Sequence, residues 1–428
     1  MERDGAYASE LLNSPRMERL SREDRSLAYE LVMSTLRWQS ELDARIAKYS
    51  SQKLSRLDAE VRCALRLAAC QLSHLQRIPA HAAVHVSVEL VKFSGKRSAA
   101  PFVNAVLRKV AADAKNPVSK SAEAGANELA TELSHPEWMV ARWIDMYGYS
   151  AARSICEAGL HAPQSALRIC SDGAEEELAQ AGVVLAPGAL LTSARRLVSG
   201  ELSQSAAFRE HRVAVQDEGS QLVAALLGDG SRILDCCAAP GGKTAAIAAR
   251  NPHAEITAVE LHEHRARLLR ERVTASNVRV VTGDVTSLEF AEKFDRILAD
   301  VPCSGTGTLA ANPEIKWRLK PEEFAGLQDL QVSILRAAAQ ALAPGGRLVY
   351  STCSLEPEEG ERVVDQLLNG SERLSVVSCD EILNELRKRG ELAWQGPAPL
   401  TAGPFLRTLP GVHPCDGFFA AVLTKRAN

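Results

Sequence analysis

The chain has 428 residues, of which 46% are hydrophobic and 24% are charged, as in ordinary soluble proteins with sizeable cores. At roughly 150 residues per domain, this length predicts about three domains. No apolar run approaches the roughly 18 residues of a membrane-spanning helix, and the opening MERDGAYASE lacks the basic-then-apolar pattern of a secretory signal. We therefore expect a cytoplasmic protein with no membrane partner.

The ten cysteines are too sparse for a disulfide scaffold in a chain of this length. There is no Cys-x-x-Cys pair and no Cys/His cluster with the spacing of a zinc site. We expect reduced thiols, most of them buried, and no bound metal.

The net charge of −3 is unevenly distributed. Residues 1–112 hold 18 Lys and Arg against 12 Asp and Glu, a balance of +6, so the remaining residues sum to −9. A basic segment on an acidic body suits a polyanion such as RNA, although a solvated helical surface explains the same pattern.

Residues 1–112 are predicted to form an all-helical bundle. Gly and Pro are scarce, and apolar residues recur at helical spacing in four groups: Leu27, Leu31 and Leu36; Val61, Leu65, Leu67 and Leu72; Val84, Val88 and Val91; Phe102, Val106 and Val110. Residues 113–134 are rich in Ala, Ser, Asn and Glu and are predicted to be a linker.

A second unit begins near His135–Pro136, where Trp138, Trp143 and Tyr147 suggest a short helix. Residues 165–215 then contain strand-like pieces (SALRIC, GVVL, RRLV) between turns, which predict a small α/β unit.

From about residue 216, strands alternate with helices such as His262–Thr274 and Leu327–Leu342. The expected strands are Arg232–Cys236, Ile256–Val259, Val278–Val281, Arg296–Ala299 and Arg347–Tyr350. This alternation predicts a parallel sheet covered by helices on both faces, with ligands bound at the carboxyl ends of the strands.

The first of these strands leads into ILDCCAAPGGKT, residues 233–244. Pro240, Gly241 and Gly242 form a tight loop before a helix that starts at Lys243, and the helix N-terminus favours a negative group such as a carboxylate. The loop matches neither GxxxxGK[ST] nor GxGxxG, which argues against a nucleotide triphosphatase and a nicotinamide enzyme.

Acidic residues follow the next two strands. Glu260 stands where a carboxylate can accept hydrogen bonds from ribose hydroxyls, and Gly283–Asp284 suits an adenine or ribose edge. A single acidic residue at a strand end is usually a solvated terminus or a helix cap. Features at three successive strand ends are more specific.

Cysteines follow the fourth and fifth strands. ADVPCSGTGTL contains Asp300, Pro302 and Cys303, and YSTCSLEPEEGE contains Thr352 and Cys353. Two thiols are thereby predicted at one rim of the sheet. The alternative is a pair of inert, buried cysteines, the commoner state of this residue.

The blocks CAAPGGKT, DVPCSGTG and STCS, together with RTLPGVHPCDGFFAAVL near the end, resemble the Nop/Sun family of RNA cytosine-5 methyltransferases over residues 216–428. The resemblance implies a Rossmann-like class I methyltransferase domain, with Cys353 as nucleophile and Cys303 as an aid to product release. It also implies an S-adenosylmethionine site formed by Cys237, Ala238, Ala239, Pro240, Gly241, Gly242, Lys243, Glu260, Asp284 and Asp300.

The helix that contains FVNAVLRKV resembles the NusB-type RNA-binding domain. This combination implies small-subunit ribosomal RNA as the partner. We expect a NusB-like bundle with linker (1–130), a small α/β RNA-binding unit (131–215) and the methyltransferase domain (216–428), in a monomer.

The chemistry explains why such a site needs a thiol. Carbon 5 of cytosine is a poor nucleophile, and addition of a thiolate to carbon 6 places electron density on carbon 5. After methyl transfer the proton on carbon 5 leaves and the thiol is eliminated, a step that a second thiol could assist. Asp300 is also a candidate for holding the amino edge of the base. What favours the thiolate is not evident from the sequence.

Candidate RNA contacts are Lys316, Trp317 and Arg318 after the Pro-Cys loop, with Trp317 equally well explained as a core anchor. Those on the bundle are Arg37, Lys92, Lys96, Arg97, Arg108 and Lys109, each also explained as a plain surface charge.

Three alternatives stay open. The substrate could be transfer RNA or another ribosomal cytosine. The nucleophile could be Cys303, as in DNA cytosine methyltransferases, although the Thr-Cys segment argues against that. The chain could also be a non-catalytic RNA-binding assembly factor with a vestigial pocket.

Overall fold

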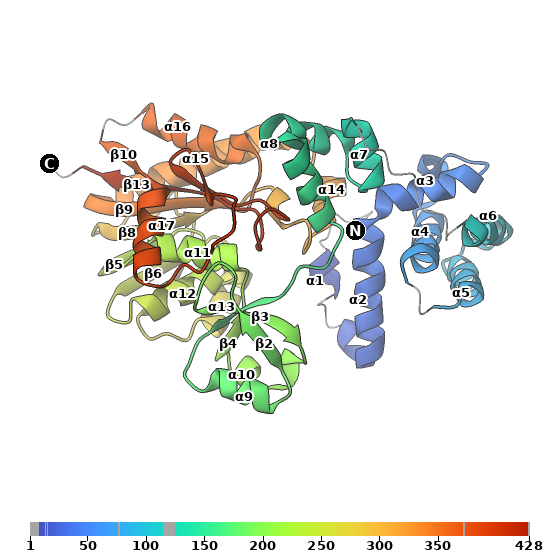
Figure 1. The fold of residues 1–428 in the computed structure, drawn as a ribbon, viewed down its shortest axis with the longest axis horizontal. Helices are drawn as coiled ribbons and strands as arrows, with labels where there is room; N and C mark the ends of the chain where they lie inside the picture. The colour runs from blue at the N-terminus through green and yellow to red at the C-terminus, as the bar shows by residue number, and fades with distance from the viewer. Residues whose placement is uncertain are drawn as a thin grey trace. The chain divides into compact units, whose positions relative to one another are not determined.

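A computed structural model describes residues 8–12, 14, 16–75, 78–113, 125–370 and 373–426. The chain forms two compact units (Figure 1). Unit 1 comprises Met1–Ala162 and Leu309–Arg318, and unit 2 comprises Pro163–Thr308 and Leu319–Asn428. A short excursion of the chain, Leu309–Arg318, therefore interrupts unit 2 and belongs to unit 1.

Unit 1 is helical, which confirms the predicted helical bundle. Its helices are α1 (Ala8–Leu12), α2 (Arg22–Arg37), α3 (Gln39–Tyr49), α4 (Ala59–His74), α5 (Ala80–Phe93), α6 (Ala100–Asp113), α7 (Ala126–Glu132), α8 (Glu137–Ala158) and α14 (Ile315–Arg318). Residues Val61 and Leu65 of α4 pack with Val106 and Val110 of α6 in one hydrophobic core, as their helical spacing predicts.

Helix α2 departs from its predicted apolar face. Leu27 is 44% exposed, whereas Met33 is fully buried. Arg37, predicted to be a surface cation, is buried as well, and its Nη2 donates a hydrogen bond to the carbonyl of Ala310 at 2.9 Å. The face of α2 that is buried near its C-terminus is therefore partly polar, and apolar spacing alone cannot identify it.

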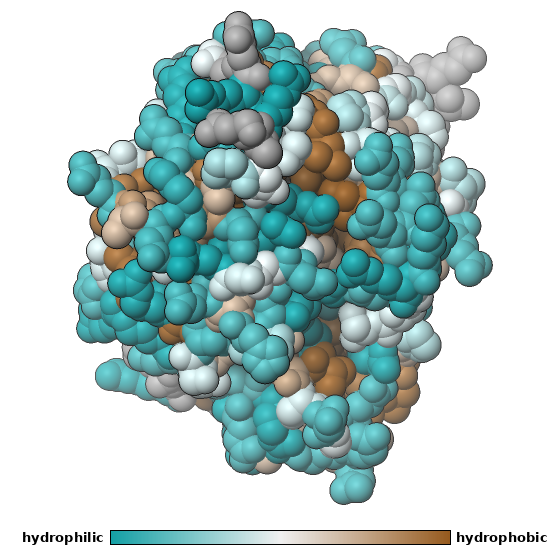
Figure 2. Space-filling model, turned by 90° about the vertical axis from the view of Figure 1, so that its left-hand side faces the viewer, coloured by the Kyte–Doolittle hydropathy of each residue, from teal (hydrophilic) through white to brown (hydrophobic). Residues whose placement is uncertain are grey.

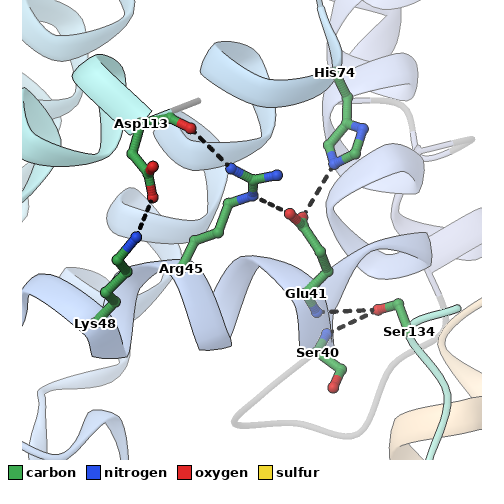
Figure 3. A network of polar contacts seen from close by, with 7 residues as sticks. All are labelled: Ser40, Glu41, Arg45, Lys48, His74, Asp113 and Ser134. Carbon is green, nitrogen blue, oxygen red and sulfur yellow. Dashed lines mark hydrogen bonds and ion pairs between the residues drawn. The ribbon is translucent and has the colours of Figure 1, made fainter. Parts of the chain in front are cut away.

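The predicted linker, residues 113–134, is partly wrong. Residues 114–124 lie outside the described part of the chain, but Ala126–Glu132 form helix α7, whose Leu129 and Ala130 are buried. Just after α7, the Ser134 hydroxyl accepts hydrogen bonds from the N–H groups of Ser40 and Glu41 at the start of α3 (Figure 3). This segment thus packs as part of the helical unit.

Glu41 is the centre of a buried polar network in unit 1 (Figure 3). Its carboxylate accepts a hydrogen bond from Arg45 and lies 3.2 Å from Nε2 of His74, whose ring stacks on Trp38. Burial opposes ionisation, but these partners outweigh it and lower the pKa of Glu41. Arg45 also donates to the carbonyl of Asp113, so the network joins α3 to α4 and to the end of α6.

The first part of unit 2 is the small α/β fold expected for this stretch. Its antiparallel sheet has the order β2-β3-β1-β4 and accompanies two short helices. The elements are β1 (Ala166–Ile169), α9 (Ala174–Gln180), β2 (Val184–Pro187), β3 (Ala194–Ser199), α10 (Ala206–Arg209) and β4 (Val213–Val215). Leu167, Leu178 and Val213 are among the residues of its core.

The rest of unit 2 is built on a large mixed sheet with the order β11-β12-β13-β9-β8-β5-β6-β7, and β10 also pairs with β13. Its strands are β5 (Arg232–Asp235), β6 (Glu255–Glu260), β7 (Val278–Thr282), β8 (Phe294–Asp300), β9 (Leu342–Thr352), β10 (Leu374–Val377), β11 (Thr401–Ala402), β12 (Phe405–Arg407) and β13 (Phe419–Lys425). Each predicted strand is present and β5 to β9 pair in parallel. The expectation of a parallel sheet holds only for this part, because β13 pairs antiparallel with β9.

Helices cover both faces of this sheet (Figure 1). Helices α11 (Glu218–Leu226), α12 (Gly242–Arg250) and α17 (Cys379–Lys388) pack with Ile233 and Val349 of the sheet. On the other face, α15 (Glu323–Ala341) and α16 (Glu361–Leu368) pack with Leu234 and Leu348. These two residues are adjacent in sequence to Ile233 and Val349, respectively. Alternate residues of one strand thus enter opposite cores, so both faces of the central strands are buried.

The two packed units do not follow the predicted domain boundaries at residues 130 and 215. Helix α8 belongs to unit 1 because Met139 and Trp143 are buried there, and the small sheet belongs to unit 2. No helix in the described part of the chain is both long and apolar enough to cross a membrane. The face in Figure 2 is mostly hydrophilic, with hydrophobic residues in small separate patches.

Candidate active site

The loop between β5 and α12 is tightly packed and ends at a helix N-terminus that has no side-chain cap. Gly241 has φ of 107°, a conformation that residues with a Cβ rarely adopt. A Cβ there would come within 2.8 Å of Val273 and 2.9 Å of Leu269. Helix α12 starts at Gly242 without a side-chain cap, so the N–H groups of its first turn can receive a negative group.

Asp235 ends β5 beneath this loop. Its Oδ2 accepts a hydrogen bond from the Thr244 hydroxyl at 2.7 Å, while its buried Oδ1 has no hydrogen-bond partner in the described chain. Burial raises the pKa of Asp235 to about 7, with a smaller contribution from the nearby charge of Asp300. A buried oxygen without a partner is costly, and it points to a ligand at this edge of the sheet.

The acidic residues after β6 and β7 lie where the strand pattern placed them. Glu260 is buried at the end of β6, and its Oε1 accepts a hydrogen bond from the N–H of His262. Asp284 is exposed and accepts bonds from the N–H and hydroxyl of Thr286. The N–H of Gly283 donates to the carbonyl of Glu260, which joins the two strand ends.

Lys243 and Asp300 form an ion pair between the start of α12 and the end of β8. Lys243 Nζ lies 2.8 Å from Asp300 Oδ2, and Asp300 Oδ1 accepts a hydrogen bond from the Ser351 hydroxyl at 2.7 Å. Burial disfavours the ammonium, but the negative charge of Asp300 and, with less weight, that of a Cys353 thiolate raise the pKa of Lys243. The ammonium of Lys243 therefore interacts electrostatically with Cys353.

The two thiols predicted at the rim are in contact. The sulfur atoms of Cys303 and Cys353 lie 3.4 Å apart, and both residues are partly exposed. The hydrogen bond with Cys353, and then burial, raise the pKa of Cys303 well above its usual range. A raised pKa favours the protonated form of Cys303, next to the sulfur of Cys353.

Two further groups were missed by sequence reasoning. Asp416 lies beside Asp217, which accepts a hydrogen bond from the N–H of Asp416; burial and the charge of Asp217 raise the pKa of Asp416. The ring of Phe418 lies 5.1 Å from Lys243 Nζ. The block CDGFF was noted only for its family resemblance, and nothing local in it shows that it folds back onto the loop after β5.

Glu359 is the second missed group. This buried carboxylate accepts hydrogen bonds from Ser304 and Ser354, which directly follow the two cysteines. Its sequence setting, EPEEGE, is typical of a solvated acidic turn. The repeated Cys-Ser doublet is the one local signal that could have drawn attention to a shared partner.

Two of the candidate RNA contacts after the Pro-Cys loop are structural. Lys316 is 1% exposed and donates hydrogen bonds to the carbonyls of Arg37 and Ser134, each at 2.9 Å. Trp317 Nε1 donates to the carbonyl of Leu36, which favours its interpretation as an anchor. A surface role for Lys316 and Arg37 is wrong because both are buried in unit 1. Arg318 is exposed, as are Lys92, Arg97, Arg108 and Lys109 on the bundle, and Lys96 is partly exposed.

Comparison with known proteins connects this chain to a family. Residues 224–424 match the family model "16S rRNA methyltransferase RsmB/F", and residues 1–112 match the NusB family. The chain is 34% identical to "Probable ribosomal RNA small subunit methyltransferase B" of Bacillus subtilis, covering 100% of this chain and 96% of the relative. It is 35% identical to "Ribosomal RNA small subunit methyltransferase B" of Vibrio cholerae, covering 83% and 79%. A solved methyltransferase homologue from Pyrococcus horikoshii is 25% identical, with a TM-score of 0.58 over 70% of this chain and 98% of that one.

Proposed function

This chain belongs to the RsmB family of methyltransferases, and on that premise we propose that it methylates carbon 5 of a cytosine in small-subunit ribosomal RNA. The methyl donor is S-adenosylmethionine and the attacking group is the thiol of Cys353. The observation that carries the proposal is the contact between the two thiols beside the Lys243–Asp300 ion pair. The names of the relatives support the choice of RNA.

The residues at the strand ends fit the cofactor. Glu260 offers a buried carboxylate for ribose hydroxyls, Asp284 suits the adenine or ribose edge, and the first turn of α12 suits the cofactor's carboxylate. The unpartnered oxygen of Asp235 supports the same site. Bound there, the cofactor supplies a methyl group on a positively charged sulfur. Asp300 lies at the edge of this set, with one oxygen held by Lys243 and the other by Ser351.

Cys353 attacks as the thiolate. A free thiol has a pKa of about 8.5, so the attacking form needs a stabilising positive charge. The ammonium of Lys243 provides it, because its raised pKa keeps it charged and part of that shift comes from Cys353. The sulfur then bonds to carbon 6, the electrons of the ring double bond move to carbon 5, and carbon 5 takes the methyl group.

Cys303 assists the release step. A base removes the proton from carbon 5, and the electron pair of that bond re-forms the ring double bond. The bond between sulfur and carbon 6 breaks, and its electron pair returns to Cys353. Cys303 keeps its proton and lies 3.4 Å from that sulfur, so its S–H can stabilise the departing thiolate. The raised pKa of Cys303 favours Cys353 over Cys303 as the nucleophile.

RNA contact is assigned to the exposed cations of unit 1 and to the small sheet of unit 2. Phe93, 91% exposed at the end of α5 and next to Lys92, offers a surface on which an unpaired base can stack. One chain supplies the thiols and the cofactor residues, so we propose that it acts as a monomer.

The test is methyl transfer from labelled S-adenosylmethionine to small-subunit ribosomal RNA stripped of ribosomal proteins, with transfer RNA as a parallel substrate. We expect the label on carbon 5 of a cytosine in the ribosomal RNA. Labelling of transfer RNA alone would contradict the proposal that ribosomal RNA is the substrate. RNA binding without any labelled cytosine would contradict the reaction and favour a non-catalytic assembly factor.

A further inference from the structure

Glu359 occupies an unusual place for a carboxylate. It ends the short 3-10 turn η6 (Pro357–Glu359) that follows β9, and its side chain is 0% exposed. Burying a charge in this way is costly unless every lone pair finds a donor. The carboxylate therefore needs partners, and the loops that carry the two thiols supply most of them.

The partners of Glu359 join the two Cys-Ser doublets. Oε2 accepts hydrogen bonds from both serine hydroxyls, that of Ser304 and that of Ser354, the latter at 2.6 Å. Oε1 accepts one from the N–H of Ser304 at 2.8 Å. Ser304 directly follows Cys303 and Ser354 directly follows Cys353, so one carboxylate holds the residue after each thiol. The two serine hydroxyls are themselves 3.2 Å apart.

A second tie runs through helix α15. Gln331 Nε2 donates to Glu359 Oε1 and to the carbonyl of Pro302, both at 2.9 Å, so the residue before Cys303 is held as well. The backbone carbonyl of Glu359 accepts a hydrogen bond from the hydroxyl of Tyr350 in β9. Glu359 thus links the loop after β8 to strand β9 and to the loop after β9, which begins with Cys353.

Other bonds between these loops do not involve Glu359. The N–H of Gly307 donates to the carbonyl of Cys353, and the N–H of Leu355 donates to the hydroxyl of Thr306. These bonds can keep the loops adjacent without Glu359. The N–H of Val301 also donates to the carbonyl of Ser351 at 3.0 Å. The residues directly before and after Cys303, Pro302 and Ser304, are tied to the Cys353 loop through Glu359 and its partners.

We propose that Glu359 is a positioning residue that sets the distance between the sulfur atoms of Cys303 and Cys353. The proposal rests on the function proposed above. A displacement of about 1 Å in a reacting group can slow a reaction by about 100-fold. Loss of Glu359 should therefore slow the chemical steps and leave the binding of RNA and cofactor nearly unchanged.

The test compares Glu359→Ala with Glu358→Ala, a matched control in the neighbouring carboxylate, which forms an ion pair with Arg362. The first readout needs no catalytic activity. Diamide, a thiol oxidant, takes two electrons and two protons from the thiol pair, and peptide mass spectrometry follows the rate of the Cys303–Cys353 disulfide. We expect a rate at least about tenfold lower in Glu359→Ala and unchanged in the control.

The second readout is the kinetics of methyl transfer. We expect kcat to fall about 100-fold in Glu359→Ala, with KM for RNA and for S-adenosylmethionine within about twofold of the unmodified protein. Glu359→Gln should recover most of both readouts, because its oxygen can still accept from the N–H groups and serine hydroxyls can accept from its NH₂.

Wild-type disulfide rates and kcat in Glu359→Ala would overturn the proposal, as would a rise in KM with kcat unchanged. If Glu359→Ala does not fold, the Ser304→Ala/Ser354→Ala double variant removes both hydroxyl donors, and a normal disulfide rate in it would overturn the proposal equally. If the unmodified protein methylates no RNA, the proposed function fails, and the disulfide rates alone still decide the positioning role.

Discussion

Lys316 is expected to make the stability of unit 1 depend on pH. Burial lowers the pKa of its ammonium from about 10.5 to about 7. Below pH 7 both the folded and the unfolded chain bind this proton. Between pH 7 and about 10.5 only the unfolded chain binds it, so the free energy of unfolding rises with pH by about 1.4 kcal/mol per unit. From pH 7 to pH 9 this contribution amounts to about 3 kcal/mol.

Lys316→Met keeps a long side chain and removes the titrating group. We expect the free energy of unfolding of the unmodified protein, minus that of Lys316→Met, to grow by about 3 kcal/mol from pH 7 to pH 9. The other titrating groups are present in both proteins. Two that interact with the charge of Lys316, His135 and Cys156, have pKa values that burial moves away from the range of pH 7 to 9, downward for His135 and upward for Cys156. Lys109→Met, in an exposed lysine of unit 1, is the control and should give a constant difference.

The assay is urea unfolding followed by tryptophan fluorescence at several pH values. Four of the five tryptophans, Trp38, Trp138, Trp143 and Trp317, lie in unit 1, so the signal reports mainly on that unit. A difference between the unmodified protein and Lys316→Met that stays constant from pH 7 to pH 9 would refute the reasoning. It would mean that the carbonyls of Arg37 and Ser134 hold the ammonium charged in the folded chain.

Further predictions concern the cofactor loop and its neighbours. Glu260→Gln should weaken S-adenosylmethionine binding by about 10- to 100-fold in calorimetry, because a charge-assisted hydrogen bond to the ribose is lost; equal affinities would contradict this role. Gly241→Ala should lower the free energy of unfolding of unit 2 by about 1–3 kcal/mol in chemical denaturation, because φ is positive and the added Cβ meets Leu269 and Val273; unchanged stability would argue against that strain. Lys243→Met should reduce kcat by at least about 100-fold, because the charge that stabilises the thiolate is lost, and an unchanged kcat would exclude Lys243 as the thiolate's partner.

The strands that form the site could be predicted because their signal is local. Each parallel strand is a short apolar run followed by a turn, and the candidate site residues stand directly after it. That is why the sequence alone assigns Glu260, Asp284 and Cys353 to one edge of the sheet. The antiparallel pairing of β13 with β9 has no such signal, because an apolar run such as FFAAVL does not encode the direction of its neighbour.

Burial of charged residues was the main limit of prediction. Lys316 and Arg37 are of residue types that are typical of nucleic-acid-binding surfaces, yet backbone carbonyls far away in sequence accept their hydrogen bonds. Glu359 has the same character, since its donors come from residues 304, 331 and 354. In each case the partner that makes burial tolerable is distant along the chain, so no local pattern can reveal it.

The central claim, covalent attack by Cys353, is tested most directly by trapping the protein–RNA adduct in Cys303→Ala. Release should slow in this variant, so we expect an adduct that survives denaturation and whose cross-linked peptide contains Cys353. Cys170→Ala, a control in a cysteine of the small sheet, should accumulate no adduct. The claim would be contradicted if Cys303→Ala forms no adduct while Cys353→Ala accumulates one through Cys303.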